Sequence, residues 1–239
     1  MALTTISRFK TAFADIERRL RQILLPTRYQ RFTDMVRQAA KKDLGVRRMQ
    51  STLLELAVIR NVLTHNSNFT RPRVDLTEHA AAEIEKVRDI LLAPPSLLPA
   101  FAKEVVTCNA DEPLSKVLDK MATNSVKKLP IYRGPNLVGL LVSRTLARWL
   151  ARCATTGIPL FSRVNVEHLL QYQEGDGRYK LLSSSATYFD AVAEFQETAC
   201  KWGHHLDAIL ITANGNDAEP LLGIVTVAQM PKLVQAIEV

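Results

Sequence analysis

The chain has 239 residues, 47% of them hydrophobic, which is enough for two domains with ordinary buried cores. Its net charge is +7, no apolar run approaches the roughly 18 residues of a membrane helix, and the first apolar positions are interrupted by Arg8 and Lys10. The three cysteines match no zinc or CxxC spacing. We therefore expect a cytoplasmic protein with reduced thiols, no membrane segment, no signal peptide and no metal site.

The positive charge is unevenly distributed along the chain. Residues 1–95 contain 17 lysines and arginines against 10 acidic residues, whereas residues 96–239 contain 14 of each kind. The whole excess therefore lies in the first part of the chain, where it would attract a polyanion such as RNA. The alternative is a solvated surface that only keeps the protein soluble.

The first 95 residues have the periodicity of amphipathic helices. Apolar residues recur every three or four positions between Ile6 and Ile23, and Pro26 follows. Further helices are predicted over 29–42, from 46 to about 65, and from 75 to about 93, the last opened by an Asp75 and Glu78 capping box. Four such helices predict a helical bundle over residues 1–95.

A proline-rich stretch, Pro94 to Pro99, follows and predicts a linker over residues 96–102. Beyond it, predicted strands at 129–132, 137–142, 208–211 and 221–225 alternate with predicted helices. The two halves end alike, in Gly139-Leu-Leu-Val-Ser143 and Gly223-Ile-Val-Thr226, so we predict an internal repeat. The expected fold class is α + α/β, a helical bundle followed by two βαββα repeats, with Ser143 and Thr226 capping the last helix of each.

Residues 103–239 resemble a tandem pair of cystathionine-β-synthase-type (CBS) repeats, at about 103–152 and 163–239. The resemblance rests on Asp111-Glu-Pro-Leu114, on Leu129-Pro-Ile-Tyr132 and on the two Gly-to-Ser/Thr endings. It implies a compact module with a cleft that takes AMP, ATP or another adenosine-containing ligand. A Ser or Thr hydroxyl and helix N-terminal N–H groups suit a ribose or phosphate, and apolar strand residues suit an adenine ring.

The resemblance suggests a set of nucleotide-binding residues. The family pattern has an aspartate three residues after the Ser/Thr, where this chain has Leu146 and Gln229. Gln229 can still hydrogen-bond a ribose, whereas Leu146 cannot, so a site at Thr226 is favoured over one at Ser143. The alternative is a degenerate pair that binds nothing and serves dimerisation. The predicted nucleotide-binding residues are Thr226, Gln229, Gly223, Ser143 and Pro130.

Residues 1–95 resemble the HEPN family, because Arg60-Asn61-Val-Leu-Thr-His65 fits its pattern of Arg, a polar residue, three residues and His. Many HEPN domains are metal-independent endoribonucleases with a site shared by two protomers. The resemblance implies that His65 moves a proton near neutral pH, that Arg60 neutralises charge on phosphorus, and that Asn61 orients the imidazole. Arg60 and His65 lie about 140° apart around an ideal helix, so a fraying helix end or a long arginine reach is needed. The alternatives are an Arg60 ion pair with Glu55 or Glu83, and a helix-capping His65.

Together the patterns predict a homodimeric, toxin-like or defensive endoribonuclease that needs no catalytic cofactor and is regulated by an adenine nucleotide. The alternative is a non-catalytic sensor whose basic helical domain binds RNA or a protein partner. A third possibility is a purely structural dimerisation protein.

Overall fold

The computed structural model describes residues 4–25, 29–65, 76–157, 161–173, 178–203 and 205–238. The chain divides into two compact units. The helical unit comprises Met1–Pro95, Thr187–Asp190 and Val234–Val239, and the repeat unit comprises Ser96–Ala186 and Ala191–Leu233. No helix among the described residues is long and apolar enough to cross a membrane.

The described part of the first 95 residues is mainly helical, as predicted. The helices are α1 (Thr5–Leu24), α2 (Phe32–Ala39), α3 (Leu44–Arg48), α4 (Gln50–His65) and α5 (Glu78–Leu92). Two predicted details are wrong. The third helix is divided into α3 and α4, because Met49 leaves the helical conformation at φ −96° and ψ 11°. Helix α5 is capped by Thr77, whose Oγ1 accepts a hydrogen bond from the Ala80 N–H at 3.2 Å; Asp75 lies outside the described residues.

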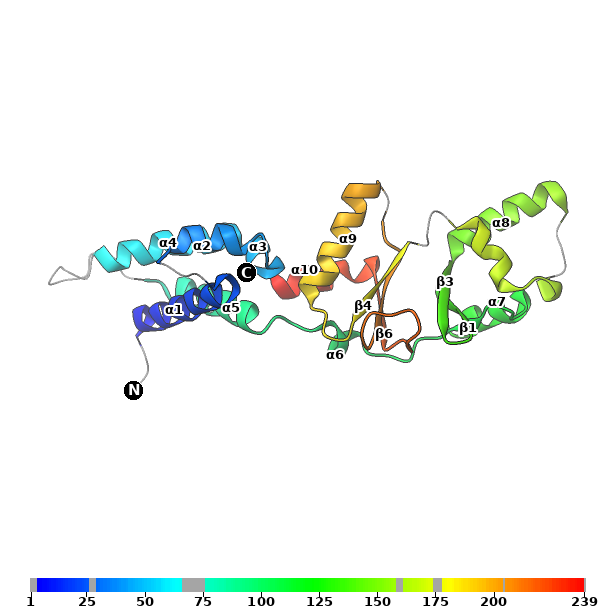
Figure 1. Ribbon diagram of the computed structural model, residues 1–239, viewed down its shortest axis with the longest axis horizontal. Helices are drawn as coiled ribbons and strands as arrows, with labels where there is room; N and C mark the ends of the chain where they lie inside the picture. Colours follow the sequence, from blue (N-terminus) through cyan, green and yellow to red (C-terminus); the bar gives the residue numbers. More distant parts are fainter. Residues whose placement is uncertain are drawn as a thin grey trace. The chain divides into compact units, whose positions relative to one another are not determined.

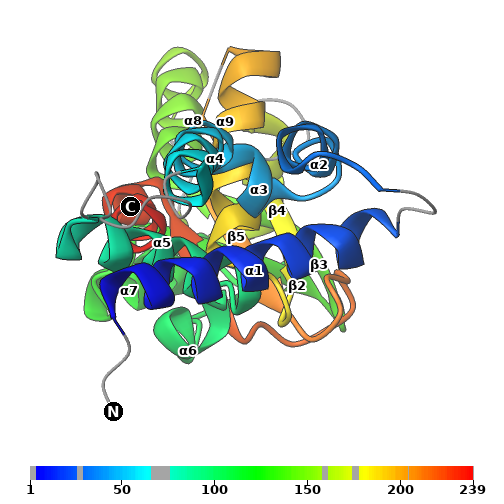
Figure 2. The same cartoon turned by 90° about the vertical axis from the view of Figure 1, so that its left-hand side faces the viewer.

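The core of the helical unit forms where α1 packs against α5 and α2 (Figure 2). The apolar stripe predicted on α1 is buried at Phe9, Phe13, Ile16 and Leu20. At the rim, Arg8 forms a two-pronged ion pair with Glu85, with nitrogen–oxygen distances of 3.0 and 2.6 Å. The apolar spacing therefore sets which face of α1 is buried, and the ion pair joins α1 to α5 at the edge of this core.

The repeat unit begins with a short helix, α6 (Leu97–Phe101), inside the segment predicted as a linker. Leu97 and Phe101 are buried, so this stretch packs within the unit. The first repeat then contains β1 (Cys108–Asn109), α7 (Leu114–Thr123), β2 (Lys128–Arg133), β3 (Asn136–Val142) and α8 (Ser143–Thr156). Two 3₁₀ helices follow, η2 (Phe161–Arg163) and η3 (Val166–Tyr172).

The second repeat has the same order of elements, which confirms the mixed helix and sheet class. It contains β4 (Tyr179–Ser183), α9 (Tyr188–Trp202), β5 (Ala208–Thr212), β6 (Gly223–Thr226), the 3₁₀ helix η4 (Val227–Gln229) and α10 (Met230–Ile237). Each repeat builds a three-stranded sheet, ordered β1-β2-β3 and β4-β5-β6. Figure 1 marks β1 and β3 in the first repeat and β4 and β6 in the second. In each sheet the first pair of strands is parallel and the second antiparallel.

The two sheets pack against each other through apolar side chains. Leu140 and Val142 of β3 belong to the same buried cluster as Ala208, Leu210 and Ile224 of the second sheet. A separate core fills the first repeat between its sheet and helices, around Trp149 and Leu141. Cys108 and Cys153 belong to this core, and burial raises the pKa of the Cys108 thiol to about 12. Both cysteines are buried packing residues, and the Cys108 thiol stays protonated at neutral pH.

The loop between β5 and β6 is held by Glu219. Its carboxylate accepts hydrogen bonds from the backbone N–H of Asn214 at 2.7 Å and from the side-chain amide of the same residue at 2.6 Å. These bonds, backbone first, lower the pKa of Glu219 to about 2. The loop also meets the first repeat, because Asp217 accepts a hydrogen bond from the Leu137 N–H at 2.8 Å.

We expect Glu219→Gln to destabilise the repeat unit at neutral pH and to lose this effect in acid. The folded-state pKa of Glu219 lies below its ordinary value of 4.5, so its stabilisation is fully present above pH 4.5 and disappears as the pH falls through about 2. Urea unfolding of both proteins between pH 7 and pH 2.5 measures the difference in free energy of unfolding. If the difference in free energy of unfolding between the two proteins stays constant over this pH range, the Glu219 carboxylate does not stabilise the fold as described.

Candidate functional site

A cavity of about 310 Å³ opens in the repeat unit where three segments meet. The first segment precedes β1, the second joins α7 to β2, and the third joins β6 to α10. The volume lies at the lower end of the range for small-molecule sites. The residues that line it are Lys103, Glu104, Val105, Val106, Ser125, Val126, Lys127, Lys128, Ile224, Thr226 and Ala228.

Local backbone geometry brings these segments together. Helix α7 ends at Thr123, and Ser125 adopts a left-handed conformation with φ 52°, which turns the chain into β2. The Val126 N–H then bonds the Met121 carbonyl at 3.0 Å. On the opposite wall, Ala102 pairs with Gly223, so the segment before β1 runs antiparallel beside β6.

Three lysines give the cavity its positive character. Lys103 and Lys127 are exposed and Lys128 is half-buried. Burial lowers the pKa of Lys128, while nearby Asp207 raises it and Arg144 lowers it. Partial desolvation disfavours the ammonium form of Lys128, so an anion bound beside it would raise its pKa again.

The predicted pair Thr226 and Gln229 is only partly at the cavity. Thr226 lines it. The Gln229 side chain turns back instead, and its Oε1 accepts hydrogen bonds from the Thr226 N–H at 2.6 Å and from the Thr226 hydroxyl at 3.2 Å. This confirms that Thr226 opens the last helical segment. Gln229 does not line the cavity and acts as the partner of that cap.

The other three predicted nucleotide-binding residues lie away from the cavity lining. Gly223 is the first residue of β6, and Pro130 is buried within β2. Ser143 is the first residue of α8 and forms no cap, because the N-cap position is Val142 and has no side-chain hydrogen bond. The predicted helix cap at Ser143 is therefore wrong.

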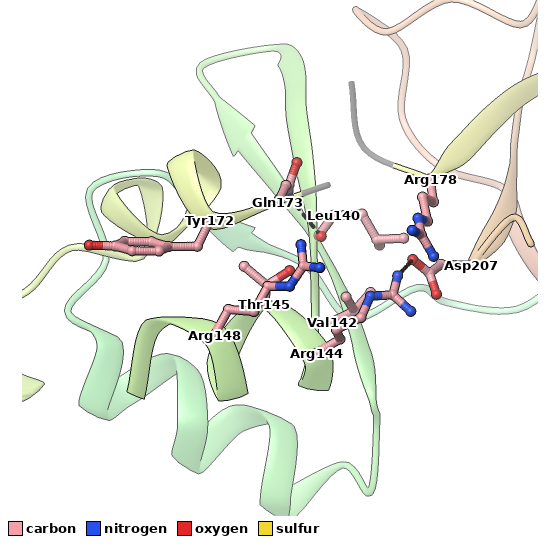
Figure 3. A pocket seen from close by; sticks show the side chains of 9 residues that line it. All are labelled: Leu140, Val142, Arg144, Thr145, Arg148, Tyr172, Gln173, Arg178 and Asp207. Atoms are coloured by element: carbon pink, nitrogen blue, oxygen red, sulfur yellow. Dashed lines mark hydrogen bonds and ion pairs between the residues drawn. The ribbon is translucent and has the colours of Figure 1, made fainter. Parts of the chain in front are cut away.

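A second, much smaller cavity occupies the equivalent place at the β3–α8 connection (Figure 3). Its volume is about 10 Å³, which is room for roughly one water molecule. Arg144 at the start of α8 pairs with Asp207 just before β5 at 2.7 Å, joining the two repeats. Gln173 donates a hydrogen bond to the Leu140 carbonyl at 2.9 Å on the other side. A nucleotide does not fit here unless these contacts open.

The residues of the predicted ribonuclease centre lie at the end of α4. Arg60 and Asn61 are exposed, and the Arg60 guanidinium donates to the Asn61 side-chain oxygen at 3.3 Å. The guanidinium also lies 5.6 Å from the centroid of the Phe13 ring. His65 is the last residue of α4, and its side chain lies outside the described part of the structure. Among the described residues, no ion pair joins Arg60 to either glutamate considered as its partner.

No group of three or more histidine, cysteine or acidic side chains is placed to hold a metal ion, within the residues that the structure describes. The sequence did not point to Lys103, Glu104 or Lys128 as site residues. The signal that was available is the pair Lys127-Lys128 directly before the strand Leu129-Pro-Ile-Tyr132.

Comparisons with known proteins concern the repeat unit. The CBS domain family model matches residues 100–152. No curated protein matches the sequence. Solved structures with a similar fold include a conserved CBS domain protein of unknown function from Thermoplasma acidophilum, with 17% identity and a TM-score of 0.42 over 59% of this chain and 73% of that one.

Two further solved structures are similar at the same level. A CBS domain-containing protein from Kribbella flavida has 13% identity and a TM-score of 0.44, over 59% of this chain and 99% of that one. The protein CbpB, solved in complex with c-di-AMP, has 12% identity and a TM-score of 0.44, over 64% of this chain and 91% of that one. From the family match, this chain contains a CBS domain at residues 100–152.

Proposed function

We propose that this chain is a regulatory protein whose CBS pair senses an adenine nucleotide in the cavity at Thr226. The observation that carries the proposal is the composition of the cavity, in which three lysines, a threonine hydroxyl and an apolar wall enclose about 310 Å³. CBS domains are generally nucleotide-sensing regulatory modules, and CbpB was solved with the adenine dinucleotide c-di-AMP.

Each part of a nucleotide has a chemical counterpart in the cavity. Phosphate oxygens accept charge-assisted hydrogen bonds from Lys103, Lys127 and Lys128. The side chains of Val105, Val126 and Ile224 are apolar and suit the faces of an adenine ring. A purely apolar ligand would leave the lysines without a counterion in the cavity, which is unfavourable.

Isothermal titration of the full chain with AMP, ATP, c-di-AMP and adenosine tests this function. We expect saturable binding of at least one phosphorylated ligand, one per cavity, with adenosine binding more weakly because it lacks the phosphate. Thermal unfolding should shift upward with the same ligand, since it binds only the folded state. No binding and no thermal shift would favour a structural dimerisation protein.

A second candidate function, metal-independent RNA cleavage by a homodimer, is favoured by one observation. Arg60 and Asn61 are exposed and hydrogen-bonded to each other on the last turns of α4. They precede His65 by five and four residues in the sequence. Arg60 is therefore accessible to a phosphodiester, and His65, the last residue of α4, is the proton carrier of this proposal. In this proposal the nucleotide bound by the CBS pair regulates the cleavage rate.

The test is cleavage of RNA in the presence of EDTA by the wild type and by Arg60→Ala and His65→Ala. We expect each variant to lose cleavage by about 100-fold or more, as for removal of an acid–base group. Arg37→Ala, which removes another exposed arginine of the helical unit, is the matched control. Cleavage by His65→Ala at the wild-type rate would reject the enzyme and leave the sensor that binds RNA or a protein.

A further inference from the structure

The cavity at Thr226 is lined by residues of both charges, because Glu104 lies among three lysines. It is the one acidic residue in the cavity lining, beside Lys103, Lys127 and Lys128. A carboxylate repels phosphate, so Glu104 does not belong to a purely anion-binding surface. Glu104 is exposed, and its carboxylate suits a part of the ligand that donates hydrogen bonds.

Glu104 has no hydrogen-bond or ion-pair partner among the described residues, unlike three other glutamates of the repeat unit. Glu112 pairs with Lys120 at 3.0 Å, Glu167 pairs with Arg133 at 2.6 Å, and Glu219 holds the loop at Asn214. No hydrogen bond or ion pair of the described residues involves Glu104, although three lysines line the same cavity. Its two oxygens therefore remain available to a ligand.

From this we infer that Glu104 is a specificity-determining residue that accepts hydrogen bonds from the vicinal hydroxyls of a ribose. The two oxygens of a carboxylate match two neighbouring hydroxyl donors, and bonds to a charged acceptor are stronger than neutral ones. The Gln229 side chain is already bonded to Thr226 at the helix cap. Glu104, on the opposite wall, is therefore the residue that binds the ribose hydroxyls in place of Gln229. The inference rests on the proposed nucleotide binding and specifies ribonucleotides as the ligand class.

The experiment measures the Kd of AMP and of 2′,3′-dideoxy-AMP by isothermal titration for the full-length wild type and for Glu104→Gln. We expect the wild type to prefer AMP by roughly 10-fold or more, the value of charge-assisted hydrogen bonds. Glu104→Gln should bind AMP more weakly and bind the dideoxy ligand as well as, or better than, the wild type, because the repulsion between carboxylate and phosphate is gone. In Glu104→Gln, the ratio of the Kd of 2′,3′-dideoxy-AMP to the Kd of AMP should therefore fall to near one.

Two controls separate this role from a structural one. Asp119→Asn removes an exposed carboxylate of α7 that does not line the cavity, and it should leave both affinities unchanged. Glu104→Asp keeps the charge on a shorter side chain and should keep part of the preference. Thermal unfolding of each variant without ligand checks that it is folded.

The remaining outcomes all count against Glu104. An equal loss of affinity for both ligands in Glu104→Gln, or an unchanged ribose preference, overturns the inference while leaving nucleotide binding intact. A wild type that binds both ligands equally overturns it as well. A wild type that binds neither ligand overturns both the inference and the proposed function.

Discussion

Lys128→Met is expected to weaken AMP binding by roughly 10- to 100-fold, which is the effect of removing a hydrogen-bonded charge from a partly desolvated site. Lys128 is half-buried at the cavity, and burial lowers its pKa in the absence of ligand. A phosphate placed beside the ammonium supplies the missing countercharge. Methionine keeps the aliphatic stem, so the packing of β2 is preserved.

The same substitution should not destabilise the unliganded protein. Because burial is the first cause of the lowered pKa of Lys128, its charged form is disfavoured in the folded state, and removing the charge relieves this penalty. Because the pKa of Lys128 is lowered, the AMP affinity of the wild type should fall as the pH rises through that pKa. Lys128→Met should lack this pH dependence. A loss of affinity without a loss of thermal stability is the expected signature.

The control is Lys116→Met, which removes an exposed lysine of α7 outside the cavity lining. Titrations of AMP into the three proteins between pH 7 and pH 10 give the comparison. If Lys116→Met loses as much affinity as Lys128→Met, the lysines act only through net charge, and the cavity is not the binding site.

Gly223→Ala should destabilise the repeat unit by about 2 to 3 kcal/mol, the upper part of the range for overpacking. A Cβ at Gly223 would lie 2.5 Å from the Phe101 carbonyl oxygen and 3.2 Å from its carbon. Both are backbone atoms, so the pairing of the chain after α6 with β6 must open to relieve the contact. That pairing also positions the following segment, 103–106, which lines the proposed cavity.

The equivalent glycine of the first repeat provides a matched control. A Cβ at Gly139 would lie 2.5 Å from Cδ2 of Leu170. This atom is the end of a flexible side chain, which can rotate away at a smaller cost, so we expect Gly139→Ala to cost less than Gly223→Ala by about 1 kcal/mol or more.

Tryptophan fluorescence during urea unfolding reports on the repeat unit, and it measures the loss of free energy of unfolding in both glycine variants. The chain has two tryptophans, Trp149 and Trp202, and both belong to the repeat unit. The two variants are compared by the midpoint and slope of this transition. Equal destabilisation by the two substitutions would show that the approach of Phe101 to Gly223 does not determine the cost.

Much of the fold was predictable because its signals are local. The run Leu137 to Val142 is apolar enough to indicate a buried strand, and the spacing on α1 indicates which face is buried. The first strand of each predicted βαββα repeat was not located, because β1 has two residues and β4 carries Lys180 and is only partly buried. Such strands depend on their neighbours in the sheet more than on their own composition.

The site was less predictable because the same residues permit two interpretations. Thr226 followed three residues later by Gln229 matches a ribose-binding arrangement and also matches a capping box. The structure shows the capping arrangement. The lysines and Glu104 come from segments far apart in the sequence, and only the pairing of Ala102 with Gly223 brings them to Thr226.

The central claim is that the cavity at Thr226 in the repeat unit holds an adenine nucleotide. The most direct measurement is a crystal structure of the full chain grown with saturating AMP. Density for the nucleotide should fill the cavity, with the phosphate at Lys103, Lys127 and Lys128 and the ribose at Glu104. A cavity that stays empty at saturating AMP, or AMP bound only elsewhere on the chain, would contradict the claim.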